Sequence, residues 1–230
     1  MLVFLSTVAL AVEQRIDRGF SLGGDLSTGN TQENSINATL RLNRNKELVD
    51  ETTLKASLDY KSANGADTKF KIYSSLRYAH SLANTVYSYA KMEFTHDKFQ
   101  DIEMRFVPTA GVGRWFFNED DLRLMGEAAL GLQADILKDN LSSGTMVLTL
   151  SSDLQWWGLV NSFDSYFALD DFANYRFTDT IFYNMYLSEY HLFKIGAKDE
   201  YSNMPVAGVK NNDFTFLISF EYRFTEIEDI

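Results

Sequence analysis

The sequence predicts a closed antiparallel transmembrane β-barrel of about twelve strands. Three observations support this fold class. Strand-length segments along nearly the whole chain alternate apolar and polar residues, as between Phe214 and Phe224, where one parity is aromatic or aliphatic and the other is polar. These segments reach about ten residues or more, the length of a tilted membrane strand. The chain also has only 2 prolines, which suits long paired strands because proline cannot donate to a strand ladder.

Composition narrows the class of protein further. The 230 residues contain no linker rich in proline, glycine and serine, so we expect one domain over residues 12–230. No internal run of about twenty apolar residues exists, which excludes a helical membrane protein. The formal net charge of −11 argues against a nucleic-acid partner. Because the chain has no cysteine, it has no disulfide framework and no thiolate metal site, and we expect no cofactor.

The amino terminus resembles part of a signal peptide. Residues 2–11 form an apolar stretch that ends in Ala9-Leu10-Ala11, a small-residue pattern typical of a cleavage site. A charged region before the apolar stretch is absent. We therefore expect residues 1–11 to be a partial signal peptide; the alternative is a short buried strand or helix.

Each predicted strand has one apolar and one polar face, and the charges must avoid lipid because Arg or Lys at mid-depth costs about 2–4 kcal/mol. In chain order the predicted strands are 19–28, 33–43, 51–61, 67–79, 84–96, 102–117, 121–136, 145–157, 162–170, 175–188, 190–202 and 212–224. Their apolar faces include Phe20, Leu22, Ile36, Leu40, Leu54, Leu58, Phe70, Ile72, Met92, Phe94, Leu130, Leu132, Leu148, Leu150, Phe193, Ile195, Phe216 and Ile218. Their opposite faces carry the charges Asp25, Arg41, Lys55, Asp59, Lys71, Arg77, Lys91, Glu93, Glu103, Arg105, Arg123, Glu127, Asp153, Lys194, Lys198, Glu221 and Arg223.

The connections between these segments alternate in length. Longer polar loops follow the odd segments, at 28–32, 62–67, 97–101, 138–144, 171–174 and 203–211, while mostly tight turns follow the even ones, at 81–84, 118–120, 158–161 and near Tyr190. The connection 45–50 is the exception. Outer-membrane barrels have short periplasmic turns and longer outside loops, so we expect the amino terminus on the periplasmic side.

Aromatic residues gather at the predicted periplasmic ends of the strands. Tryptophan and tyrosine prefer the headgroup zone of a membrane, so this pattern predicts an aromatic girdle, whereas a soluble β-sandwich would place its aromatics in the core. The girdle residues are Tyr78, Trp115, Phe116, Phe117, Trp156, Trp157, Tyr186, Tyr190, Tyr222 and Phe224.

The charged parity is predicted to line the barrel interior. Both signs occur, and neighbours on adjacent strands are often opposite, which favours a narrow lumen with interior ion pairs over a wide pore. We expect Glu103, Arg105, Arg123 and Glu127 to form one such network. The candidate pore-lining residues are Asp25, Lys55, Asp59, Lys71, Arg77, Lys91, Glu93, Glu103, Arg105, Arg123, Glu127, Asp153, Glu221 and Arg223.

Two residue patterns invite a chemical function that their spacing does not support. His80, His96 and His191 fall at different strand ends, so they cannot converge on a metal, although His96 beside Asp97 could form an acid–base pair at the outer rim. Gly111-Val112-Gly113 lies inside a strand with no helix after it, so it is not a phosphate loop; glycine there relieves crowding on the barrel wall.

Several motifs resemble the YdiY-like family of salt-induced outer-membrane proteins, which carry a domain of unknown function. They are Gly23-Gly24-Asp25-Leu26-Ser27-Thr28-Gly29-Asn30-Thr31, Arg105 followed by Gly111-Val112-Gly113-Arg114, Leu169 to Arg176, and Pro205 to Asp213 before the closing Tyr222-Arg223-Phe224. The resemblance implies an outer-membrane β-barrel and brings no catalytic residue or ligand. Outer-membrane barrels often end on an aromatic residue that the assembly machinery recognises, whereas here Thr225 to Ile230 follow Phe224.

These features lead to three functional hypotheses. The first is a narrow channel for small ions or solutes, or an envelope component that responds to osmotic or salt conditions. The second is a barrel enzyme acting on envelope lipid, and the third is a structural or adhesive barrel with acidic outer loops. We expect the outer membrane as location, its lipid and the barrel assembly machinery as partners, and no enzymatic activity.

Overall fold

The computed structural model describes residues 13–27, 33–46, 50–119, 121–138, 142–205 and 210–229. The predicted signal peptide, 1–11, lies outside them. Within these residues, no helix is long and apolar enough to cross a membrane. The strands are β1 (Glu13–Ser27), β2 (Glu33–Lys46), β3 (Asp50–Ala63), β4 (Ala66–Ala83), β5 (Val86–Asp97), β6 (Ile102–Asn118), β7 (Leu122–Leu137), β8 (Ser142–Trp156), β9 (Leu159–Ala168), β10 (Tyr175–Tyr186), β11 (His191–Ser202) and β12 (Asn212–Asp229), and the short 3-10 helix η1 spans Lys98–Gln100.

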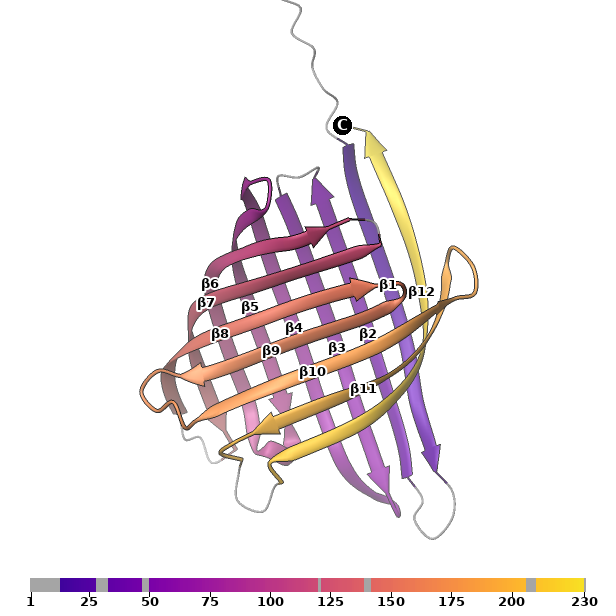
Figure 1. The fold of residues 1–230 in the computed structure, drawn as a ribbon. Helices are drawn as coiled ribbons and strands as arrows, with labels where there is room; N and C mark the ends of the chain where they lie inside the picture. The colour runs from indigo at the N-terminus through magenta and orange to yellow at the C-terminus, as the bar shows by residue number, and fades with distance from the viewer. Residues whose placement is uncertain are drawn as a thin grey trace, which may run out of the picture.

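The strands form one closed antiparallel barrel, which confirms the predicted fold class. Each strand pairs with its sequence neighbours, and β1 closes the barrel against β12 with Glu13 opposite Asp229 (Figure 1). This closure makes both terminal strands longer than predicted, because each supplies the hydrogen-bond partners of the other's end. The first described residue and the carboxyl terminus lie at the same end of the barrel, here called the terminal end; the opposite end is called the loop end.

The apolar parity faces outward, as predicted. Leu130 on β7 is 54% exposed and Ile218 on β12 is 48% exposed, values that neither side chain would have in a dry core. The inward parity holds the buried residues, including Tyr87, Tyr89 and Glu93 on β5. Outward apolar and inward polar side chains are the pattern of a membrane barrel, and the inverse of a soluble one.

Two connections are tighter than predicted. Residues 62–67 were expected to form a longer loop, but β3 and β4 meet in a two-residue turn whose central residues, Asn64 and Gly65, have φ of 51° and 79°. Positive φ at both positions gives a turn whose twist matches the strands. Likewise, Trp157 and Gly158 alone join β8 to β9, so Asn161 lies inside β9 and not in a turn.

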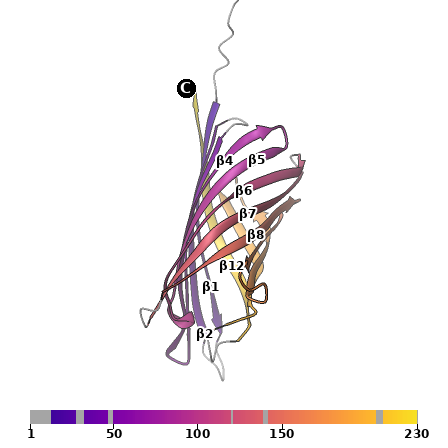
Figure 2. The same ribbon diagram turned by 90° about the vertical axis from the view of Figure 1, so that its left-hand side faces the viewer.

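The barrel is flattened. Its outline is broad in Figure 1 and narrow in the view turned by 90° (Figure 2). A flattened cross-section brings opposite walls within reach of long side chains, so that ion pairs can form across the lumen.

Candidate functional site: the charged lumen

Near the loop end, ion pairs join opposite walls of the barrel. Lys69 Nζ on β4 lies 3.0 Å from Glu200 Oε2 on β11, and Lys71 contacts the same carboxylate. Lys198 on β11 lies 3.3 Å from both Glu200 and Asp59, the latter on β3. The strands β3 and β4 lie across the closed strand order from β11, so these contacts cross the lumen. The charged side chains keep between 13% and 23% of their surface accessible, so the crossing is not dry.

A second crossing centres on Glu93 of β5. Its carboxylate is buried and accepts hydrogen bonds from Tyr73 Oη of β4 (2.6 Å) and Tyr166 Oη of β9 (2.7 Å). Lys91 lies 3.0 Å from Glu93 and 3.6 Å from Asp164 on β9. A buried carboxylate is tolerated when it is paired and its oxygens are hydrogen-bonded, and both conditions hold here.

Side chains fill the terminal end of the lumen on the β4–β7 side. Arg77 contacts Glu127 on β7, and Tyr87 donates to the same carboxylate over 2.8 Å. Beneath this pair, Tyr87 and Tyr89 pack with Ala79 and Ala129 in the buried cluster of the described residues. This half of the lumen is therefore occupied by packed side chains.

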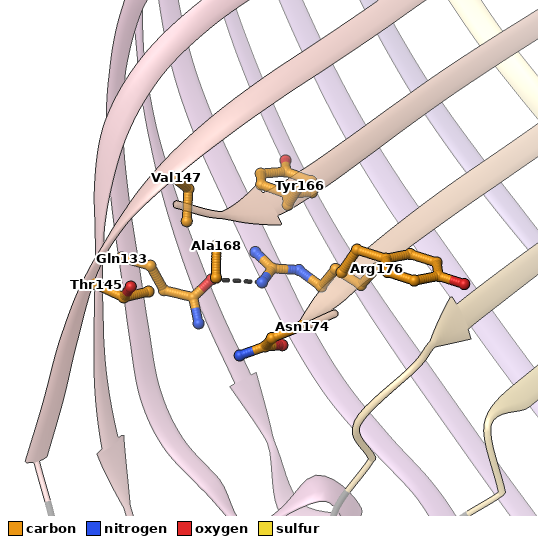
Figure 3. A pocket seen from close by; sticks show the side chains of 8 residues that line it. Gln133, Thr145, Val147, Tyr166, Ala168, Asn174 and Arg176 are labelled. Carbon is orange, nitrogen blue, oxygen red and sulfur yellow. Dashed lines mark hydrogen bonds between the residues drawn. The ribbon is translucent and has the colours of Figure 1, made fainter. Parts of the chain in front are cut away.

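Arg105 and Arg176 complete the wall of β6 to β10. Arg105 donates two hydrogen bonds to Asp135 on β7, of 2.7 and 2.8 Å. Arg176 on β10 reaches across β9 and β8 to Gln133 on β7, and its guanidinium lies 4.1 Å from the Tyr166 ring centre (Figure 3). The cavity that Gln133, Tyr166 and Arg176 help to line measures about 10 Å³, at the lower limit for one water molecule.

The wall formed by β1–β3 and β11–β12 is more open. Glu221 on β12 pairs with Lys194 on β11 and lies 3.2 Å from Arg223 on its own strand. Arg41 on β2 and Lys55 on β3 stand directly opposite each other on the inward parity, and both are exposed. Since the outer surface of these strands is apolar, this exposure is to the lumen.

The predicted pore-lining set is largely placed on the inward parity, with two corrections. Glu103 is exposed at a register shift between Ile102 and Met104, so the extra residue displaces it from the interior. Arg123 shares the parity of Glu127 but lies exposed near the terminal end, so the expected network of Glu103, Arg105, Arg123 and Glu127 is wrong. Asp153 accepts a hydrogen bond from Ser162, and the side chain of Asp25 lies outside the described residues.

Most of the predicted girdle is exposed at the terminal end. This group is Tyr78, Phe116, Phe117, Trp156, Trp157, Tyr186, Tyr190 and Tyr222. The prediction for Trp115 is wrong: it shares the inward parity of Val107 and Thr109 on β6, and its ring packs on Tyr87. The register shift between Trp115 and Phe117 follows it and leaves both Phe116 and Phe117 exposed. Tyr186 has the inward parity of β10 and lies at the strand end beside Arg223. The side chain of Phe224 lies outside the described residues, but β12 continues beyond it to Asp229.

Two groups beyond the strands show shifted ionisation. The Thr145 hydroxyl donates a 2.6 Å hydrogen bond that lowers the pKa of the Asp170 carboxyl. A hydrogen bond to the Glu189 carboxylate raises the pKa of the Tyr190 phenol. Both lie at a rim of the barrel, so they affect the ends of hairpins and not the lumen.

Sequence reasoning omitted several lumen residues. Asp164, Tyr166 and Arg176 all make contacts that cross or line the interior. The same alternation that placed the other charges would have found Asp164, since it has the opposite parity to Phe163 and Phe167 on β9. It also omitted two acids on the outward parity, Asp179 and Asp199, which are register partners.

The histidines do not converge. His80 pairs with Asp50 at the terminal end, whereas His96 Nδ1 contacts the Glu103 carbonyl oxygen on the outer surface. His191 lies beside the Tyr222 and Phe220 rings. In the part of the chain that the structure describes, no group of His, Asp and Glu side chains is arranged to hold a metal ion.

Comparison with known proteins gives a family and a set of distant barrels. A family model described as "Protein of unknown function, DUF481" matches residues 20–224. No curated protein matches the chain. The translocator domain of the autotransporter NalP from Neisseria meningitidis is 13% identical with a TM-score of 0.42, over 95% of this chain and 90% of that one. The NanC porin is 10% identical with a TM-score of 0.48, over 94% and 99%. An outer-membrane channel from Pseudomonas putida F1 is 11% identical with a TM-score of 0.47, over 98% and 100%.

Proposed function

We propose that this chain, which belongs to the family described as "Protein of unknown function, DUF481", is a narrow outer-membrane channel for small ions. The family description names no activity, so the proposal is argued from the lumen. The family-level part of the predicted resemblance is thereby confirmed, while the salt-induced, YdiY-like character stays a prediction. The proposal has two parts, the location and the transport, and they rest on different observations.

The location is supported by the outer surface. Large apolar side chains, such as Phe20, Leu40 and Phe216, stand exposed on the outward parity of successive strands. An apolar surface that encircles the barrel would aggregate in water and is stabilised by lipid. A bacterial outer membrane is the expected site for a barrel of this form.

One observation supports the transport part of the proposal: the ion pairs that cross the lumen stay partly accessible to water. Glu200 and its lysine partners are 13–20% accessible although they link opposite walls. A barrel stabilised only by a packed interior would bury such groups or replace them with apolar ones. A thin, charged water path passes small ions and excludes larger solutes.

Single-channel recording on the purified, refolded protein in planar bilayers tests this proposal. We expect discrete current steps of small, uniform size in potassium chloride. A protein that is folded by its circular dichroism spectrum and by its heat-dependent gel mobility, yet carries no current, would argue for a structural role.

A barrel enzyme is the second candidate, and its most specific group is His96 with the neighbouring Asp97. Asp97 caps η1, since its carboxylate accepts hydrogen bonds from the amides of Phe99 and Gln100. Assays of lipid hydrolysis with the wild type and with His96→Ala separate this candidate from a channel, because only an enzyme loses turnover with that substitution.

A further inference from the structure

On the open side of the lumen, two adjacent cations form no ion pair with any described acid. Arg41 on β2 and Lys55 on β3 are register partners, so their side chains leave the same patch of the inner wall. Side chains directly opposite in an antiparallel pair have Cβ atoms about 4.5–5.5 Å apart, and like charges in that position destabilise the sheet. Both residues are exposed, unlike the other lumen cations.

The acids nearest to this pair are already engaged. Glu221 lies within electrostatic range of Arg41, but it pairs with Lys194 and Arg223. Asp164 lies within range of Lys55, but it pairs with Lys91 and accepts a hydrogen bond from Ser151. Among the described side chains, neither Arg41 nor Lys55 takes part in an ion pair.

Two further cations, each paired with acids of its own, lie within electrostatic range of Lys55. Lys198 and Lys91 both repel the Lys55 ammonium across the lumen. In contrast, the lysines near the loop end share Glu200 and Asp59, so their charges are compensated within the protein. Arg41 and Lys55 are therefore adjacent, exposed and without an ion pair among the described side chains, on the open side of the lumen.

We propose that Arg41 and Lys55 form a binding site for a small soluble oxyanion, of the phosphate or carboxylate class. A guanidinium presents two parallel N–H donors that match the geometry of such an anion, and an ammonium adds a further donor and charge. The bound anion removes the repulsion between the two cations. In a conducting lumen this site favours the passage of anions over cations, so it specifies the selectivity of the proposed channel. Binding of the anion does not itself require conduction.

Thermal unfolding of the refolded protein in detergent tests the site with inorganic phosphate as the probe, against sodium chloride at the same ionic strength. We expect the wild-type midpoint to rise with phosphate concentration and to follow a binding isotherm. Lys55→Met and Arg41→Gln should each need at least tenfold more phosphate for the same rise. Lys138→Met, which removes an exposed lysine outside the lumen, should respond like the wild type.

A rise that is equal in the wild type, Lys55→Met, Arg41→Gln and Lys138→Met would overturn the site, because it would reflect a general effect of phosphate. If a lumen variant does not refold, Arg41→Lys keeps the charge while removing the planar fork, and should still weaken binding. The two measurements distinguish a failure of the proposed channel from a failure of the anion site. A protein that is stabilised by phosphate but carries no current retains the site without the channel, and a current without phosphate stabilisation retains the channel without the site.

Discussion

At the scale of single residues, Arg105 shows how the interior is stabilised. Its guanidinium donates to both oxygens of Asp135, a geometry that fixes the two side chains against each other. Both side chains are largely removed from water, with 18% and 10% of their surface accessible. Removal of one partner therefore leaves a charge without compensation in a poorly solvated place, whereas removal of both does not.

We predict that Arg105→Ala lowers the free energy of unfolding by about 2–3 kcal/mol, at the low end for a buried pair because water reaches Arg105. The double variant Arg105→Met with Asp135→Leu should lose less than Arg105→Ala alone. Urea unfolding in lipid vesicles, followed by tryptophan fluorescence, measures both. Lys138→Ala serves as the control, and equal losses in the single and double variants would show that the pair makes no coupled contribution.

The sequence predicts the side of the wall on which Arg105 lies but not its partner. Alternation is a property of one strand, and it places Arg105 inward whatever surrounds it. The expected network with Glu103 and Glu127 rested on shared inward parity alone, whereas Asp135 is the register partner of Arg105 and Glu127 lies opposite Gly113. Register shifts at Ile102/Met104 and Trp115/Phe117 interrupt the pairing of β6 with β7, and they leave Glu103 and Phe117 exposed although both have the inward parity of Arg105. Alternation carries no signal for either shift.

At the scale of strands, glycines allow neighbouring backbones to approach on the curved wall. A Cβ added at Gly111 on β6 would overlap the Ala128 carbonyl oxygen and the Ala129 side chain on β7, as the sequence analysis anticipated for this Gly-Val-Gly run. At Gly144 on β8, the nearest atom, the Gln133 carbonyl oxygen, would be 4.0 Å away. The two positions differ in space, although both lie in strands.

Gly111→Ala should therefore destabilise the barrel by about 1–3 kcal/mol, the usual effect of overpacking, while Gly144→Ala should be neutral to within about 0.5 kcal/mol. Urea titration of both variants in the same vesicles makes the comparison. Equal stability of the two would mean that the wall near Gly111 relaxes without cost.

The existence of the strands was predictable from alternation, whereas their ends were not always so. The turn at Asn64 and Gly65 shortens the expected 62–67 loop because the two residues adopt positive φ and let pairing continue to Ala63 and Ala66. Similarly, β1 and β12 extend beyond their predicted ends because they pair with each other. Both effects depend on a partner strand, which one segment of sequence does not specify.

At the scale of the whole molecule, the even–odd alternation of turns and loops predicts the orientation in the membrane. Asn64 lies at the loop end, and Glu119 follows β6 at the terminal end. If the termini are periplasmic, an impermeant maleimide added to intact cells should label Asn64→Cys and not Glu119→Cys. The native chain has no cysteine, so background labelling is absent. The reverse pattern would invert the proposed orientation.

The flattening of the barrel was beyond the reach of sequence. The prediction of interior ion pairs assumed neighbouring strands, whereas Lys69 and Glu200 are 131 residues apart and lie on opposite walls. Such pairing depends on the cross-section of the closed barrel, which follows from the strand number, tilt and stagger taken together. No local pattern encodes it.

Ion pairs between opposite walls narrow the water-filled lumen of the proposed channel, and Glu200 is the shared acid of one crossing. The most direct test compares the single-channel conductance of the wild type with that of Glu200→Gln, which keeps the side-chain size but removes the acid that Lys69, Lys71 and Lys198 share. Asp171→Asn on an exposed connection serves as control. We predict small steps for the wild type and the control, and larger, more anion-selective steps for Glu200→Gln. If all three proteins are folded and carry either no current or the same current, the crossing does not control a lumenal path.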